Sequence, residues 1–178
     1  MRSCVTEGES PLGDLVADAQ RNALRSDISL VRTAAIGSDL PAGPVTWLEL
    51  LALHEPPRPL ATIVVTGATL RQVLERALSE WVPSVHVSGI VVEYDPGASA
   101  GRRVRKVRFD DGRELKDGSS YRLALAEPLT RSPAYPMLSG RAITPSMVTD
   151  VDALASYLRR LPQPVSPPEQ IRFREVGR

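Results

Sequence analysis

Three carboxylates and a serine lie close together near the start of the chain, in the stretch GESPLGDLVADAQ at residues 8–20. Asp14 and Asp18 are four residues apart, and this spacing places them on one face of a helix. Two carboxylates held close together could perform general acid and base catalysis. Helix capping and hydrogen bonds to neighbouring loops would use the same residues, and we favour this structural interpretation.

Neither histidine of the chain indicates a catalytic or metal site. His54 follows a predicted helix, where it would act as a C-terminal cap. His86 lies between two valines of a predicted strand, where we expect it to be solvated or satisfied by a hydrogen bond. Ser10 has no nearby base and no nucleophile-elbow turn, and the single Cys4 excludes an intramolecular disulfide and a cysteine cluster for zinc. We therefore predict no catalytic residue and no metal ligand in this chain.

The overall composition is that of one soluble globular domain covering residues 1–178, with 42% hydrophobic and 24% charged residues. A formal net charge of +1 gives no global field that would attract nucleic acid or an anionic membrane. We expect neither a membrane span nor a signal peptide, because no sufficiently long apolar run occurs. The compartment stays open: cytoplasmic for the chain as it stands, periplasmic or extracellular if it belongs to a longer precursor.

A basic run, RRVRKVR at residues 102–108, has the charge to hold an anion or RNA. Aromatic residues that would stack on bases are not interleaved with it. A solvated strand face, or an edge strand that its charges protect against further pairing, explains the run better.

The first predicted element is a helix that begins after Ser10. A serine suits the N-cap, and Pro11 suits the first helical position, where its missing N–H costs nothing. Apolar residues then recur at spacings of three and four along residues 12–24, which gives the helix one buried face. Gly13 is unfavourable inside a helix, so we expect another part of the chain to pack closely against it.

The remaining segments mix helical and strand periods. Short apolar or alternating segments predict strands at 28–33, 60–67, 85–95, 102–110, 121–127 and 171–176, and amphipathic segments predict helices at 46–54, 68–81 and 151–161. Thr46 and Glu49 have capping-box spacing, and Thr149 or Asp150 would cap the last helix. Glycine and proline predict a loop at 37–44 and irregular structure at 56–59 and 128–147. Helices interspersed with hairpins indicate an α+β fold.

In this order, the segments resemble the C-terminal, nucleotide-binding domain of the 5′-nucleotidase family, which includes UDP-sugar hydrolases and 2′,3′-cyclic phosphodiesterases. ESPLGDLVADA at 9–19 is close to the family's E-[ST]-x-L-G-[ND]-L-x-x-D-A, and VTGATLRQVLE at 65–75 resembles its L-T-G-x-x-L-x-x-x-L-E. VSGIVVEYD at 87–95 resembles its S-G-[LF] strand. The matching motif residues, for which we expect a mainly structural role, are Glu9, Ser10, Gly13, Asp14, Asp18, Gly67, Ser88 and Gly89.

The resemblance implies an α+β domain built around a mixed β-sheet with flanking helices. In the family this domain binds the substrate, whereas a separate metallophosphatase domain holds two divalent metals and performs the hydrolysis. The present sequence contains no D-x-H or G-N-H motif. The resemblance therefore implies a chain that does not hydrolyse by itself and that uses divalent metals only through a metallophosphatase partner.

The positions at which the family contacts its ligand are altered in this chain. The family reads the nucleoside with an Asn and a G-G-[IF]-R loop after the first strand, and the equivalent stretch here is VRTAAIGSDL at 31–40. Arg32 stands at the position of the Asn. Gly37 stands at that of the arginine, where it cannot bind a phosphate or carboxylate bidentately.

The family's aromatic contacts are also replaced. Its P-F-x-N turn is PPRP at 56–59, and its G-G-D-G-[YF] loop is EPLTRSPAYP at 127–136. Ser84 lies near one expected phenylalanine, and the nearest aromatic residues are Tyr135 and Trp81. By position, the candidate ligand-binding residues are therefore Arg32, Gly37, Arg58, Ser84 and Tyr135.

Two functions follow from these patterns. The first is a non-catalytic binding or interaction module, a pseudoenzyme whose degenerate nucleotide pocket either takes a different small anionic ligand through Arg32 and Arg58 or binds nothing specific. The second is the substrate-binding half of a split metal-dependent 5′-nucleotidase or phosphoesterase of nucleotide catabolism, a hydrolase completed by a separate metallophosphatase chain. The altered arginine, asparagine and aromatic positions favour the first.

Overall fold

The computed structural model describes residues 9–53, 56–79, 82–166 and 168–177. Its strands are β1 (Ile28–Arg32), β2 (Pro59–Thr66), β3 (Val85–Ser88), β4 (Ile90–Tyr94), β5 (Val104–Phe109), β6 (Ser120–Ala126), β7 (Ile143–Thr149) and β8 (Phe173–Glu175). Its α-helices are α1 (Pro11–Leu24), α2 (Trp47–Leu53), α3 (Gly67–Ala77) and α4 (Asp150–Leu158), and short 3₁₀ turns are η1 (Thr33–Ala35), η2 (Glu127–Arg131) and η3 (Pro136–Leu138).

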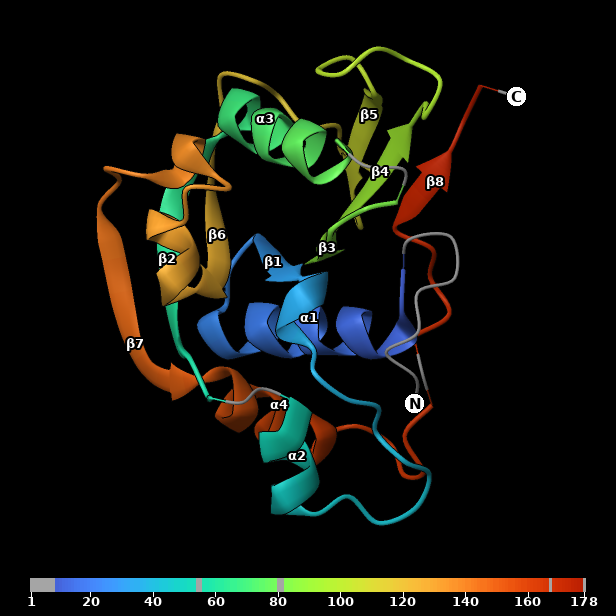
Figure 1. Cartoon of the computed structure of the whole chain (residues 1–178), viewed down its shortest axis with the longest axis vertical. Coiled ribbons are helices and arrows are strands. Elements are labelled where there is room, and N and C mark those ends of the chain that lie inside the picture. Colours follow the sequence, from blue (N-terminus) through green and yellow to red (C-terminus); the bar gives the residue numbers. More distant parts are fainter. Residues whose placement is uncertain (1–8, 54–55, 80–81, 167, 178) are drawn as a thin grey trace.

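The strands form two sheets of mixed direction. The larger sheet has the order β3-β1-β6-β2-β7, in which β1 is parallel to β6 and the other neighbours are antiparallel. The smaller sheet has the order β5-β4-β8, with β4 antiparallel to β5 and parallel to β8. Helices flank both sheets (Figure 1), and the predicted α+β class with a mixed sheet is confirmed.

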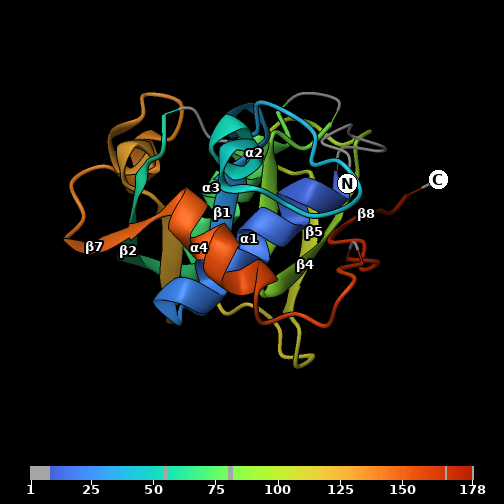
Figure 2. The same ribbon diagram turned by 90° about the horizontal axis from the view of Figure 1, so that it is seen from below.

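Helix α1 is the central support of the fold. It runs beneath β1 and β3, with α2 and α4 packed on its other side and α3 on the far side of the sheets (Figures 1 and 2). One apolar core joins α3 to the two sheets, and a second joins α1, α2 and α4 through residues such as Leu15, Leu53 and Leu154. Among the described residues, no helix combines the length and hydropathy that crossing a bilayer requires.

Three of the helix starts follow the capping predicted from the sequence. The Ser10 hydroxyl accepts the Gly13 N–H at 3.0 Å and begins α1. At the start of α2, the Glu49 carboxylate accepts a hydrogen bond from the Thr46 N–H at 2.6 Å. At α4 the cap is Thr149, whose hydroxyl accepts the backbone N–H of the third helical residue in a capping box.

The predicted strand at 85–95 is wrong, because the chain breaks at Gly89 into β3 and β4, which belong to different sheets. Gly89 has a φ of +90°, a region that favours glycine. A Cβ there would lie 2.3 Å from the carbonyl oxygen of Asp27. Continuous apolar alternation predicted one strand, whereas the glycine turns the chain from one sheet into the other.

The Pro-rich region 128–147 contains a strand, β7, that the sequence did not predict. It pairs with β2 at the edge of the larger sheet, and an edge strand tolerates a proline such as Pro145. Irregular structure was also predicted for 56–59, yet β2 begins at Pro59. The described part of the predicted helix 68–81 runs as α3 from Gly67 to Ala77.

The basic run lies on β5, the outer strand of the smaller sheet. Arg105 pairs with Asp95 at 2.6 Å, and Lys106 pairs with Glu114. Of the two structural interpretations, the structure supports an edge strand, and its charged side chains are paired with carboxylates.

Candidate functional site

The carboxylates of the first motif are engaged in structural contacts. The His86 ring is completely buried and lies against Gly13, where an added Cβ would be 2.3 Å from its Cδ2 atom. The Nδ1 atom of His86 is 3.3 Å from Oδ1 of Asp14, and its Nε2 atom is 3.4 Å from the hydroxyl of Thr33. His86 is thus satisfied rather than solvated, and the close packing expected against Gly13 is that of an imidazole ring.

A buried arginine, Arg172, completes this network. It is 4% exposed, and its Nη1 donates to the carbonyl oxygens of Asp14 at 3.1 Å and Val87 at 2.6 Å. Its Nη2 donates to Asp18 at 2.8 Å, and the other oxygen of that carboxylate accepts from Ser88 at 2.6 Å. The network ties α1 to β3 and to the chain entering β8. Arg172 lies in the predicted strand 171–176, but no pattern in the sequence indicates that its side chain is buried.

Glu9 fastens the closing strand to the start of α1. Its carboxylate accepts the backbone N–H groups of Arg172 at 3.0 Å and Phe173 at 2.9 Å. Burial, with the nearby charge of Asp14, raises the pKa of Glu9 to about 7, although the two N–H groups act in the opposite direction.

We expect the Glu9→Gln variant to lose part of the pH dependence of stability. Between pH 4.5 and about 7 the folded protein keeps a proton on Glu9 that the unfolded chain releases, so stability falls as pH rises through this window. Glutamine keeps an acceptor for the N–H groups and has no proton to lose. Urea unfolding of Glu9→Gln at pH 5 and pH 7.5 should show a smaller decline than wild type. Equal declines in Glu9→Gln and wild type would refute the assignment, and Glu169→Gln at an exposed position is the control.

Gly67, in the motif at 65–75, and Gly89, in the motif at 87–95, both lie where another part of the backbone approaches too closely for a side chain. A Cβ on Gly67 would lie 2.3 Å from the carbonyl oxygen of Lys116, and the Gly67 N–H donates to Ser119 at 3.0 Å. Together with Gly89, this supports the expectation that the motif residues are mainly structural.

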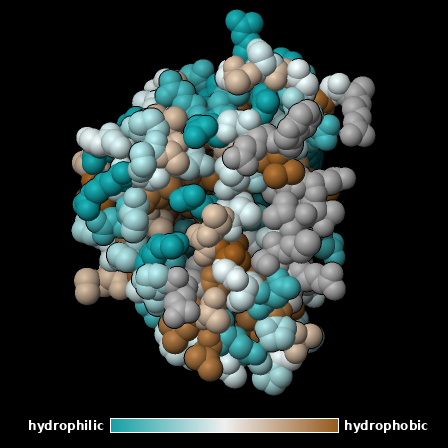
Figure 3. Space-filling model, viewed as in Figure 1, coloured by the Kyte–Doolittle hydropathy of each residue, from teal (hydrophilic) through white to brown (hydrophobic). Residues whose placement is uncertain are grey.

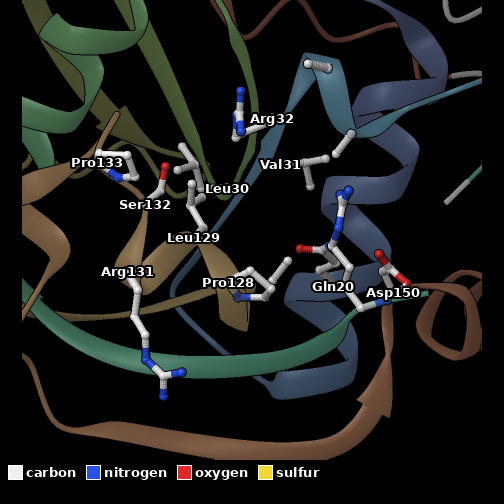
Figure 4. A pocket seen from close by; sticks show the side chains of 14 residues that line it. Gln20, Leu30, Val31, Arg32, Pro128, Leu129, Arg131, Ser132, Pro133 and Asp150 are labelled. Atoms are coloured by element: carbon white, nitrogen blue, oxygen red, sulfur yellow. Dashed lines mark hydrogen bonds between the residues drawn. The ribbon is translucent and has the colours of Figure 1, made fainter. Parts of the chain in front are cut away.

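A pocket of about 350 Å³ opens at the C-terminal end of β1. It is lined by Gln20 of α1, the end of β1 with η1, the residue before β2, η2 with the loop after it, and the first residue of α4. The molecular face in Figure 3 is hollowed near its centre, and Figure 4 shows Gln20 and Asp150 on one side of the pocket, opposite Pro128 and Leu129.

Arg32 and Arg58, two of the residues predicted from the sequence, both line this pocket. Arg32 is the last residue of β1. The backbone of Arg58 is fixed to the start of α4, because its N–H donates to Oδ1 of Asp150 at 3.0 Å. The same oxygen also accepts the Val151 N–H at 2.9 Å. Arg131 lines the pocket too, but Figure 4 shows its side chain extending away from the others, and it pairs with Glu127 at 3.3 Å.

Two further candidates lie in an adjoining cavity of about 510 Å³, which shares Arg32 with the first pocket. Ser84 and Tyr135 line it, with their hydroxyls 3.4 Å apart. Tyr135 is 3% exposed and belongs to the apolar core, so its ring is not free to sandwich a base. Gly37 lines neither cavity, and its N–H donates to Leu53 at 2.9 Å.

Two residues of interest are not described, since His54 and Trp81 lie outside the residues that the structure covers. Within the described ranges, no three His, Cys, Asp or Glu side chains come close enough together to hold a metal ion. The described residues thus offer no fit for the two-metal centre that the resemblance implies for a partner domain.

Comparison with known sequences shows which protein family the chain belongs to. Residues 1–131 match the family described as the 5′-nucleotidase, C-terminal domain. The chain belongs to this family. Endonuclease YhcR of Bacillus subtilis (strain 168) is 24% identical over 164 residues, which are 90% of this chain and 13% of that protein. The uncharacterized metallophosphoesterase YunD of the same organism is 27% identical over 150 residues, which are 76% of this chain and 32% of that protein.

Solved structures show the same fold for this 5′-nucleotidase C-terminal domain. The 5′-nucleotidase precursor from Thermus thermophilus matches with a TM-score of 0.87 at 21% identity, covering 100% of this chain and 38% of that one. A putative 5′-nucleotidase from Staphylococcus aureus, in complex with alpha-ketoglutarate, matches with a TM-score of 0.79 at 15% identity, covering 95% and 37%. The chain therefore spans less than two fifths of these proteins.

Proposed function

We propose that this domain binds a small anionic ligand in the pocket at the end of β1 and that it does not hydrolyse that ligand by itself. The observation that carries the proposal is the position of Arg32 and Arg58, which both line the pocket. Within the described ranges, neither guanidinium forms an ion pair with a carboxylate. Two cationic forks are therefore available to a ligand.

The chemistry of the lining supports an anion. A guanidinium binds phosphate or carboxylate with two parallel hydrogen bonds, and it binds more strongly where apolar walls limit water. Here Leu30, Pro128 and Leu129 supply such walls. The Asp150 carboxylate also lines the pocket, but one of its oxygens already accepts two backbone N–H groups, which partly compensate its charge.

The size and walls of the pocket favour a ligand smaller than a nucleotide. Its volume of about 350 Å³ is near the lower limit of ordinary ligand sites. The described lining residues are aliphatic, proline, serine, glutamine, aspartate and arginine side chains, whereas base recognition uses aromatic stacking. The complex of the Staphylococcus aureus protein with alpha-ketoglutarate, a small dianion, supports including dicarboxylates among the probes.

Thermal unfolding with added anions tests this proposal. A ligand that binds the folded state stabilises it by RT ln(1 + [L]/Kd), which is about 2.7 kcal/mol at a hundredfold excess over Kd. Inorganic phosphate, glycerol 3-phosphate and succinate should raise the unfolding temperature above that in sodium chloride of equal ionic strength. The rise should disappear in Arg32→Ala and Arg58→Ala and persist in Arg105→Ala, an exposed arginine on β5. An undiminished rise in Arg32→Ala would overturn the pocket assignment.

A second candidate is the substrate-binding part of a metal-dependent phosphoesterase. It is favoured by the limited span of the match, because the chain covers 38% of the Thermus thermophilus protein and 32% of the metallophosphoesterase YunD. A phosphatase assay with Mn²⁺ or Zn²⁺, with and without a separate metallophosphatase domain, distinguishes the two. Turnover that requires both parts, and falls in Arg32→Ala, would favour this second function.

A further inference from the structure

The proposed anion pocket contains a buried polar atom that lacks a partner. Gln20 is 2% exposed, and within the described part of the chain no donor lies in hydrogen-bond reach of its Oε1 atom. The side chain projects from α1 into the pocket that Arg32 and Arg58 also line, and Figure 4 shows it across from Pro128 and Leu129.

An unpaired buried acceptor is unusual enough to need a reason. Native proteins pair nearly all buried polar groups, so each exception needs an explanation, such as a bound water, an ion or a functional role. The neighbours of Gln20 on the buried face of α1, Val16 and Ala17, are apolar. An apolar side chain at position 20 would complete that face without burying an acceptor, so the glutamine is not explained by packing.

We propose that Gln20 determines specificity in this pocket by accepting a hydrogen bond from a hydroxyl or amine of the ligand. This inference rests on the proposed function, because the anionic group of the same ligand is held by Arg32 and Arg58. The ligand is then a small anion that carries a hydrogen-bond donor on its skeleton, such as a hydroxylated or aminated phosphate or carboxylate.

The geometry of the pocket supports a ligand with these two ends. Gln20 lies on the same side as Asp150, whose carboxylate adds negative potential that favours a donor there, whereas Arg32 ends β1. A ligand in this pocket would direct its anionic group toward the guanidinium groups and its donor toward Oε1 of Gln20. An analogue without the donor would leave Oε1 buried and unpaired, which is the condition under which polar sites discriminate strongly.

A matched pair of ligands tests the role of Gln20 separately from the proposed anion pocket. Glycerol 3-phosphate and n-propyl phosphate share a phosphate and a three-carbon skeleton, and the second lacks the hydroxyls. By isothermal titration calorimetry, wild type should bind glycerol 3-phosphate at least about tenfold more tightly. In Gln20→Leu the ratio of the two dissociation constants should fall to about 1, with Gln20→Met as a second, unbranched replacement. Arg32→Ala should weaken both ligands together.

A stability measurement excludes a merely structural role for this side chain. Removing an unpaired buried acceptor should leave the unfolding midpoint of Gln20→Leu unchanged or raised, whereas a glutamine that bonds within the protein would lower it. If wild type binds glycerol 3-phosphate and n-propyl phosphate equally well, and both still depend on Arg32, the role of Gln20 is overturned but the anion pocket is not. Selectivity preserved in Gln20→Leu would also overturn it. Failure of both ligands to bind wild type would instead overturn the anion pocket itself.

Discussion

Gly13→Ala is expected to destabilise the domain by about 2–3 kcal/mol, the cost of overpacking a filled core. Alanine would otherwise favour the helix, so a loss of stability isolates the steric effect. The new methyl group would lie 2.3 Å from Cδ2 of the buried His86 ring, which is fixed by Asp14 on one side and Thr33 on the other. Urea unfolding followed by circular dichroism measures the change.

The histidine offers a direct control for this prediction. In a His86→Ala background the ring is gone, so adding Gly13→Ala should cost little or become stabilising. Gly118→Ala, where nothing lies within 4 Å of the added Cβ, should be nearly neutral in wild type. If Gly13→Ala costs as much without the imidazole as with it, the packing of His86 is not the reason for this glycine.

Arg172→Met should be more damaging than Gly13→Ala, with an expected loss of about 3–5 kcal/mol. Methionine fills a similar volume but removes the guanidinium donor from the Asp18 carboxylate and from the carbonyl oxygens of Asp14 and Val87 in a buried site. Because the guanidinium joins α1 to β3 and to the chain leading into β8, we also expect faster amide exchange in β8. Arg174→Met, on the exposed face of the same strand, is the matched control. A loss no greater than in that control would show that the network is dispensable.

Asp14 and Asp18, the two carboxylates that lie four residues apart in the first motif, make contacts that join secondary-structure elements. Asp14 positions His86, and Asp18 joins Ser88 to Arg172. These contacts hold α1 against β1 and β3, and the fixed end of β1 carries Arg32 into the pocket. The motif and the pocket use different side chains of the same helix, α1. Gln20 follows Asp18 by two residues and lines the pocket.

Sequence patterns predicted the elements whose signals are local. The caps at Ser10, Thr46 and Thr149 are made by side chains within three residues of the helix start, and all three are present. The chain break at Gly89 and the strand β7 were missed because they depend on distant partners: the backbone at Asp27 in one case and β2 in the other. Periodicity within a segment contains no information about such partners.

The candidate site was predictable only in part for the same reason. The family resemblance placed Arg32 and Arg58 at the pocket, although they are 26 residues apart in sequence, and the structure brings both to it. Gln20 was missed because it lies in a helical motif whose residues have structural roles. Its one distinguishing property, an acceptor without a donor, exists only in the folded chain.

Phosphorus NMR of glycerol 3-phosphate with the purified domain tests the central claim most directly, because one spectrum reports both binding and hydrolysis. We predict that wild type, in the presence of Zn²⁺, broadens or shifts the phosphomonoester resonance, and that the Arg32→Ala/Arg58→Ala variant does not. We also predict that no inorganic phosphate resonance grows above that of a protein-free sample. An unperturbed ester resonance with wild type, or inorganic phosphate accumulating with this chain alone, would contradict the account.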